Sequence, residues 1–89
     1  MFNACFTNRF ADCESYAREA LQTLGDNPSN KDSRLFSAQG HLGWALARLG
    51  RHAEAKPFLS QAIDGYNQLG RRPFTMTQFE SALHDIAPR

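Results

Sequence analysis

Two stretches of this chain align with each other without a gap, and this internal repeat limits the fold more than any other feature. Residues 8–21 read NRFADCESYAREAL and residues 50–63 read GRHAEAKPFLSQAI, a spacing of 42 residues from Asn8 to Gly50. Most aligned positions are identical or similar in size or chemistry. A segment that recurs at such a spacing is typical of proteins that stack one supersecondary unit, because a single unit cannot bury its own apolar face.

Apolar and small residues recur at intervals of three and four along most of the chain, which places them on one face of a helix. This periodicity predicts helices over residues 9–24, 32–49, 52–69 and 75–87. Extending the repeat alignment backwards makes residues 1–7 a partial first helix or stub. Gly50 and Gly70 are suitable residues to end the helices before them. Thr75 followed by Gln78 is a capping-box pattern that begins the last helix. No segment reads as a strand, so the predicted fold is all-α.

Three features break or oppose this helical pattern. Turn-forming residues fill positions 25–30, and Pro88 stops the last helix. Pro57 lies inside the third predicted helix, where it removes one backbone hydrogen bond. Because Pro57 is only in about the second turn, the cost is smaller than in the middle of a helix, and the prediction of a helix over 52–69 stands.

Small and large apolar residues follow a fixed order in the second half of the chain: Leu42, Gly43, Leu46, Gly50, Ala55, Leu59 and Ala62. This order resembles the tetratricopeptide repeat (TPR) family, whose motif places such residues at fixed offsets. The 42-residue spacing is similar to the longer variant of kinesin light chains and many bacterial regulatory proteins. The chain departs from the family at Gln39, where Trp is usual, and at Asn67, where Pro is common.

The resemblance implies antiparallel helix-turn-helix pairs stacked as a short α-solenoid of about 1.5–2 repeats. One domain would span residues 1–89: a partial helix or stub (1–7), the second helix of a first repeat (9–24), a complete repeat (32–69) and a capping helix (75–87). Residues 43, 55 and 62 would let helices approach closely, and Gly50 would allow the left-handed turn between them. The chain is expected to be either a repeat protein with a stub or a piece of a longer repeat array.

In this family the first helix of each repeat lines a concave groove that binds partners. The corresponding positions include Ser37, His41, Trp44 and Arg48, which also form one stripe at helical spacing. A weaker mapping onto the last helix adds Gln78, Ala82 and Asp85. Trp and Arg are frequent interface anchors. On this interpretation, Trp44→Ala weakens partner binding by about 2 kcal/mol with little loss of helicity. The alternative is that Trp44 packs against Phe2 or Phe6, and the sequence does not decide between the two.

The predicted function is a protein–protein or peptide interaction module that acts as a scaffold or adaptor. One alternative is a self-associating structural module that forms a homo-oligomer through apolar surface on its terminal helices, since a repeat buries its faces only against neighbours. Others are a regulatory fragment of a larger repeat protein, and a helical enzyme fragment or small-molecule regulator domain. The sequence does not name the partner.

Charge and hydropathy argue against two classes of partner. A net charge of +1 with no basic cluster predicts no binding to nucleic acid. No apolar stretch approaches the roughly 20 residues that a membrane-spanning helix needs. The first residues lack the basic-then-apolar order of a signal peptide, so the predicted location is cytoplasmic.

Residues with catalytic or metal-binding chemistry do not form a recognisable pattern. The three histidines, His41, His52 and His84, share no metal-ligand spacing, and there is no glycine-rich phosphate loop. His52 is expected to pack at the start of its helix. Cys5 and Cys13 are predicted to be small apolar core residues rather than a disulfide or metal ligands. The sequence therefore predicts no catalytic site, metal or cofactor, and no enzymatic activity.

Overall fold

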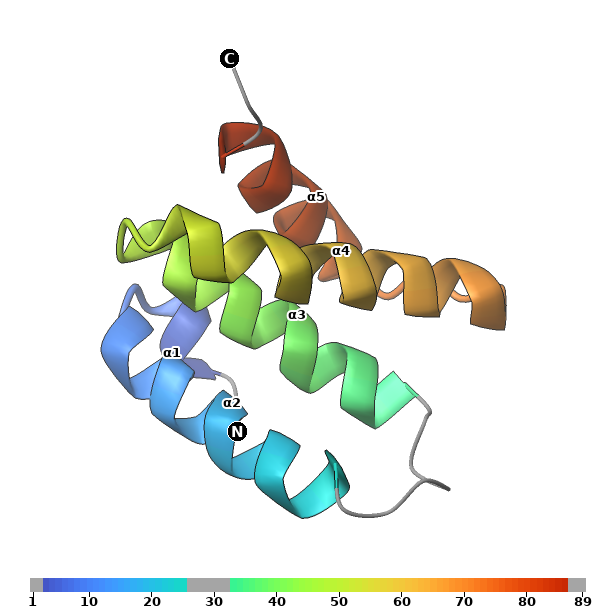
Figure 1. Ribbon diagram of the computed structural model, residues 1–89, viewed down its shortest axis with the longest axis horizontal. Helices are drawn as coiled ribbons and strands as arrows, with labels where there is room; N and C mark the ends of the chain where they lie inside the picture. The colour runs from blue at the N-terminus through green and yellow to red at the C-terminus, as the bar shows by residue number, and fades with distance from the viewer. Residues whose placement is uncertain (1–2, 26–32, 87–89) are drawn as a thin grey trace.

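The computed structural model describes residues 3–25 and 33–86, and every regular element in these ranges is an α-helix (Figure 1). The elements are α1 (Asn3–Phe6), α2 (Phe10–Gly25), α3 (Ser33–Arg48), α4 (His52–Leu69) and α5 (Met76–Ile86). The predicted all-α fold is confirmed, and the helix predicted over 52–69 has the predicted bounds, with Pro57 inside it. The turn cluster at 26–30, the predicted helix start at Asp32 and the stop at Pro88 lie outside the described residues.

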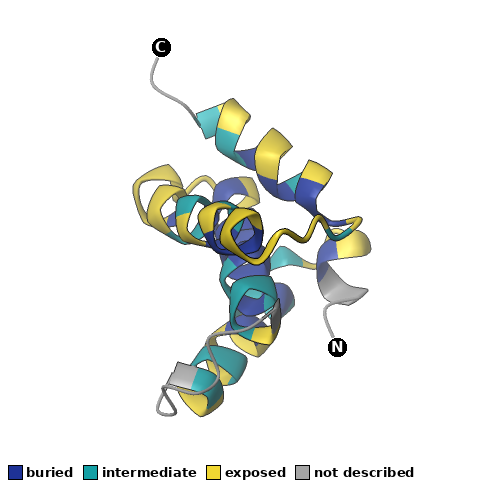
Figure 2. Ribbon diagram, turned by 90° about the vertical axis from the view of Figure 1, so that its right-hand side faces the viewer, coloured by how far each residue is buried: buried dark blue, intermediate teal, exposed yellow. Residues whose placement is uncertain are grey.

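Helix α3 is the centre of the molecule and contacts all four other helices. It runs antiparallel to α4: Phe36 at its start packs against Tyr66 near the end of α4, and Gly43 in its second half meets Leu59. It runs in the same direction as α5. His41 contacts Phe79 in the first half of α5, and Arg48, at the end of α3, forms an ion pair with Asp85 near the end of α5. Buried residues gather where these helices meet, and the outward sides of the helices are exposed (Figure 2).

The small residues predicted to allow close helix packing lie where the helices touch. A Cβ atom built on Gly43 would be 2.6 Å from Cγ of Leu59 and 2.9 Å from its backbone nitrogen. Ala55 and Ala62 of α4 are fully buried. The antiparallel contact between α3 and α4 therefore depends on the absence of a side chain at position 43.

The turn between α3 and α4 recurs between α1 and α2. Gly50 has φ +84° and Asn8 has φ +64°, and these residues are aligned in the internal repeat. The amide of Gly50 donates to the carbonyl of Ala47 at 3.2 Å, and the amide of Asn8 donates to that of Cys5 at 3.4 Å. Asn is among the few residues besides Gly that adopt this left-handed conformation readily. The sequence repeat therefore corresponds to a repeated backbone turn.

The residues after each turn also match. Arg9 pairs with Asp12, and Arg51 pairs with Glu54 at the aligned positions. In both turns the amide four residues after the arginine donates to the arginine carbonyl at 3.0 Å. The segment that repeats in sequence thus begins both α2 and α4 in the same way.

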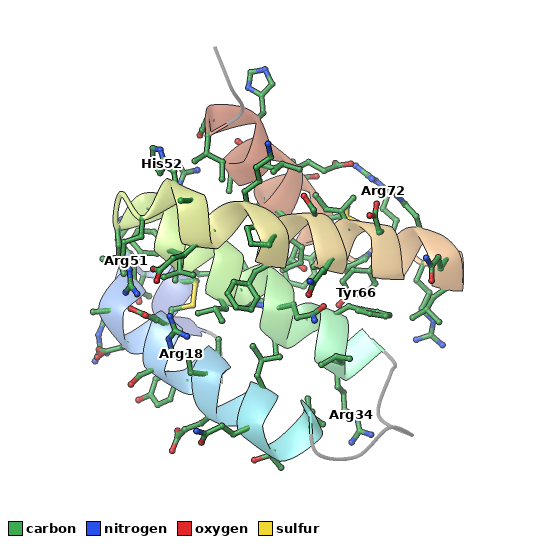
Figure 3. The ribbon with its side chains drawn as sticks, in the orientation of Figure 1. Arg18, Arg34, Arg51, His52, Tyr66 and Arg72 are labelled. Atoms are coloured by element: carbon green, nitrogen blue, oxygen red, sulfur yellow. A yellow bond between two sulfur atoms is a disulfide. The ribbon has the colours of Figure 1, made fainter. Side chains whose placement is uncertain are left out.

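Charged side chains connect the two repeated segments. Glu14 of α2 accepts from Arg18 at 2.9 Å and from Arg51, at the start of α4, at 2.8 Å. Figure 3 shows both arginines beside α2, with Arg51 reaching down from the start of α4. Because the two arginines are exposed to solvent, these ion pairs add little to stability, and they orient the helices more than they stabilise them.

A disulfide joins Cys5 of α1 to Cys13 of α2. The prediction that both cysteines are buried is confirmed, with 1% and 0% of their surface exposed, but the prediction that they are only apolar core residues is wrong. The turn at Asn8 folds α1 back onto α2 and brings the two Cα atoms to 5.3 Å, within the range that a disulfide bridges. The spacing in sequence gave no sign of this, because the pairing depends on the turn.

Candidate interaction surface

The predicted stripe on α3 is the side of that helix that faces α1 and α5. Trp44 contacts Phe6 of α1, and His41 contacts Phe79 of α5. Arg48, one turn further along, forms an ion pair with α5. The structure therefore brings the stripe next to α5, which also carries Gln78, the fifth predicted site residue.

Trp44 is buried rather than open to a partner, with 7% of its surface exposed. The ring of Phe6 meets the indole edge-on at a centroid distance of 5.2 Å, and that of Phe10 lies at 6.1 Å. This is the packing alternative that the sequence left open. A partner would reach the indole only if Phe6 moved, so a binding role for Trp44 stays a prediction.

His41 is buried among aromatic rings of three helices. Its centroid lies 5.3 Å from that of Phe79, 6.0 Å from that of Trp44 and 6.3 Å from that of Phe6. Its Nδ1 lies 2.8 Å from the carbonyl oxygen of Ser37, a distance at which a protonated Nδ1 donates. Burial lowers the pKa of His41, and the hydrogen bond to Ser37 offsets this effect only in part. His41 therefore acts as a neutral core residue near pH 7.

Stability should fall as the pH drops below about 6.5, the usual pKa of a free histidine. Because the folded chain holds the pKa of His41 below that value, the unfolded chain binds more protons in this window, and protonation favours unfolding. The contribution of the neutral His41 ring to stability is complete at a pH above the pKa of the unfolded chain. It is lost as the pH falls from there toward the lower pKa of the folded chain. Urea unfolding at pH 5 and pH 7.5 measures this loss. His41→Gln, which does not titrate, should lose less stability over the same range, and an equal loss would contradict the assignment.

Arg48 is exposed, and Gln78 is half-buried. Arg48 donates to Asp85 of α5 at 3.1 Å, and both side chains are at least a third exposed. With its amide oxygen and nitrogen exchanged, Gln78 donates to the carbonyls of Thr75 and Phe74 at 3.2 and 3.1 Å. An exposed ion pair is weak, so a partner can compete for Arg48 or Asp85 at little cost.

An exposed aromatic pair, which the sequence reasoning missed, lies over the same region. Phe74, between α4 and α5, has 79% of its surface exposed and stacks on Phe6, which has 45% exposed, at a centroid distance of 5.9 Å. Phe74 belongs to no apolar helical stripe, and an aromatic residue in a turn has no core face to fill. The place of Phe74 in a turn was the feature of the sequence that could have indicated its exposure. We refer to Phe6, Phe74, Gln78, Arg48 and Asp85 as the candidate face.

His52 does not have the packing role predicted for it. The residue is exposed at the start of α4 (Figure 3), because the helix turns this position toward solvent. Among residues 3–25 and 33–86, no group of three His, Cys, Asp or Glu side chains is arranged to hold a metal ion.

Comparison of the chain with protein-family models, curated proteins and solved structures found no match. In the part of the chain that the structure describes, no helix combines the length and the apolar character needed to cross a bilayer.

Proposed function

We propose that this chain is a protein- or peptide-interaction module, a short TPR-like α-solenoid that acts as a scaffold or adaptor in the cytoplasm. The repeated turn and the antiparallel nesting of α3 and α4 support the repeat architecture. In such a stack, α3 and α5 are the first helices of successive repeats, and they lie side by side in the same direction. The candidate face extends across these two helices and α1.

The single observation that carries the binding proposal is the exposed Phe6–Phe74 pair. Aromatic residues and Arg are enriched in protein interfaces, and a stacked pair of rings in water gains from being covered. In this proposal a partner covers Phe74 and Phe6 and pairs with Arg48 or Asp85. The indole of Trp44 supports these residues from below and is not the first contact.

Phe74→Ala should weaken partner binding by about 1–2 kcal/mol. Because Phe74 is 79% exposed, its removal should leave the fold intact. The partner is first captured from native cell extract with the wild-type chain and identified by mass spectrometry. Purified partner is then titrated into wild-type protein, Phe74→Ala and Arg48→Ala by calorimetry.

Tyr16→Ala is the matched control, because Tyr16 is an aromatic residue of α2 with 46% of its surface exposed that lies outside the candidate face. It should bind the partner as the wild type does. Equal affinity for the wild type and Phe74→Ala, or an equal loss in Tyr16→Ala, would remove the candidate face from the proposal.

Self-association is the second candidate function, favoured by exposed large apolar residues beyond the candidate face. Tyr16, Leu49 and Leu69 each have between 41% and 46% of their surface exposed. Sedimentation of the isolated chain over a range of concentrations separates the two functions. A monomer at all concentrations would rule out self-association, and a dimer that Phe74→Ala dissociates would assign the face to a second copy of the chain.

A further inference from the structure

Helix α1 depends on the rest of the molecule to stay folded. It is a single turn of four residues, and an isolated helix of that length is not stable in water. The described contacts that join it to the rest of the molecule include the disulfide from Cys5 to Cys13 and the packing of the Phe6 ring on Trp44. Both sulfur atoms lie against the carbonyl oxygen of His41, at 3.8 and 3.7 Å, so the disulfide also holds α1 against α3.

The position of α1 affects how far Trp44 and His41 of α3 are covered. Phe6 directly follows Cys5, and its ring packs on both Trp44 and His41. Phe6 also carries the stack with Phe74. If α1 moved away, the indole of Trp44 would become accessible and the aromatic pair would separate.

We propose that the Cys5–Cys13 disulfide is a redox latch that keeps α1 over Trp44, and that reduction releases α1 and opens this side of α3 to a partner. The binding consequence rests on the proposed function, whereas the movement of α1 does not. The oxidised chain presents the Phe6–Phe74 pair. The reduced chain presents the stripe of Trp44 and Arg48 that the sequence pattern indicates.

The chemistry is thiol–disulfide exchange with a small thiol such as glutathione. A thiolate attacks one sulfur, forms a mixed disulfide and releases the other cysteine as a thiolate, which takes up a proton. A second thiol then attacks the mixed disulfide and frees the remaining cysteine. Two thiols thus give two electrons and two protons to the protein and leave as one disulfide. Because the protein sulfurs are buried, α1 must open locally before the first attack.

Trp44 reports on the latch directly, because it is the only tryptophan in the sequence. The chain is oxidised with oxidised glutathione, and samples are compared with and without dithiothreitol. Thiol titration counts the free cysteines, acrylamide quenching measures access to Trp44, and far-ultraviolet circular dichroism measures helicity. We expect two thiols to appear on reduction, quenching to increase severalfold and helicity to stay nearly unchanged.

Three variants make the test specific. Cys5→Ala/Cys13→Ala should show the high quenching of the reduced chain in either condition. Phe6→Ala, with the disulfide intact, should also expose Trp44, whereas Tyr16→Ala should respond to reduction as the wild type does. Unchanged quenching in the fully reduced chain or in Phe6→Ala overturns the proposal. The proposal is also overturned if the disulfide does not form, or if it cannot be reduced under native conditions.

Loss of helicity on reduction also overturns the latch, because the disulfide would then hold the whole fold rather than α1. None of these measurements needs a partner, so the latch and the proposed function fail separately. If quenching behaves as expected but the reduced and oxidised chains bind the same partner equally, α1 moves without controlling binding, and the regulatory half of the proposal is wrong.

Discussion

Replacing Trp44 by alanine is expected to lower the free energy of unfolding by about 3–5 kcal/mol, the usual cost of removing a large buried aromatic side chain. The indole is 7% exposed and is covered by Phe6 and Phe10, so its removal leaves a cavity among rings that cannot close in easily. A chain of 89 residues has a total stability of about 4–13 kcal/mol. A substantial fraction of the Trp44→Ala molecules should therefore be unfolded.

Urea unfolding followed by circular dichroism measures this effect. Trp44→Phe is the matched variant, because it keeps an aromatic ring in the site and should cost clearly less than Trp44→Ala. Arg48→Ala changes an exposed member of the same stripe and should stay within about 1 kcal/mol of the wild type. Wild-type stability in Trp44→Ala would mean that the indole is not a core residue, and the open-groove interpretation would then gain support.

The same variants separate packing from binding. The sequence-based hypothesis expects Trp44→Ala to weaken partner binding while the helices remain. If the indole is a support for Phe6, a binding defect in Trp44→Ala should accompany its loss of stability, and Trp44→Phe should recover much of both. A binding defect in Trp44→Phe at wild-type stability would instead indicate direct contact with the partner.

The features that sequence predicted well are local ones. The spacing of apolar residues determines where a helix can bury one face, and Gly50 and Gly70 end helices because they adopt positive φ. Helix α4 therefore has the predicted bounds. The internal repeat aligns Asn8 with Gly50, and the structure shows that the turn at Gly50 recurs at Asn8, 42 residues earlier.

The features that sequence did not predict depend on contacts between distant segments. The stripe through Trp44 identified one side of α3, but what covers that side depends on α1, whose position is fixed by a turn and a disulfide. The pairing of Cys5 with Cys13 became visible only once that turn was known. Phe74 was missed because helical periodicity says nothing about a residue between helices. The candidate face and the predicted stripe thus both include α3, but they differ in which side chains are exposed to solvent.

Gly43→Val should disrupt the α3–α4 contact, with a loss of about 3 kcal/mol or more, at the upper end of the cost of overpacking a core. A Cβ atom at this position would be 2.6 Å from Cγ of Leu59 and 2.9 Å from its backbone nitrogen. The Leu59 side chain can change rotamer, but its backbone moves only if α4 shifts as a whole. Thermal and urea unfolding measure the loss.

Gly50→Ala is the control, because nothing lies within 4 Å of a Cβ atom there and its φ of +84° should cost only roughly 1–2 kcal/mol. The double variant Gly43→Val/Leu59→Ala should lose less stability than the sum of the two single variants, since removing the buried Leu59 side chain relieves the Cγ contact but not the backbone contact. A favourable interaction energy in this double-mutant cycle would show that the two residues meet as described. If Gly43→Val were as stable as the wild type, α3 and α4 would not approach closely at this point, and the repeat architecture that supports the proposed function would lose its structural basis.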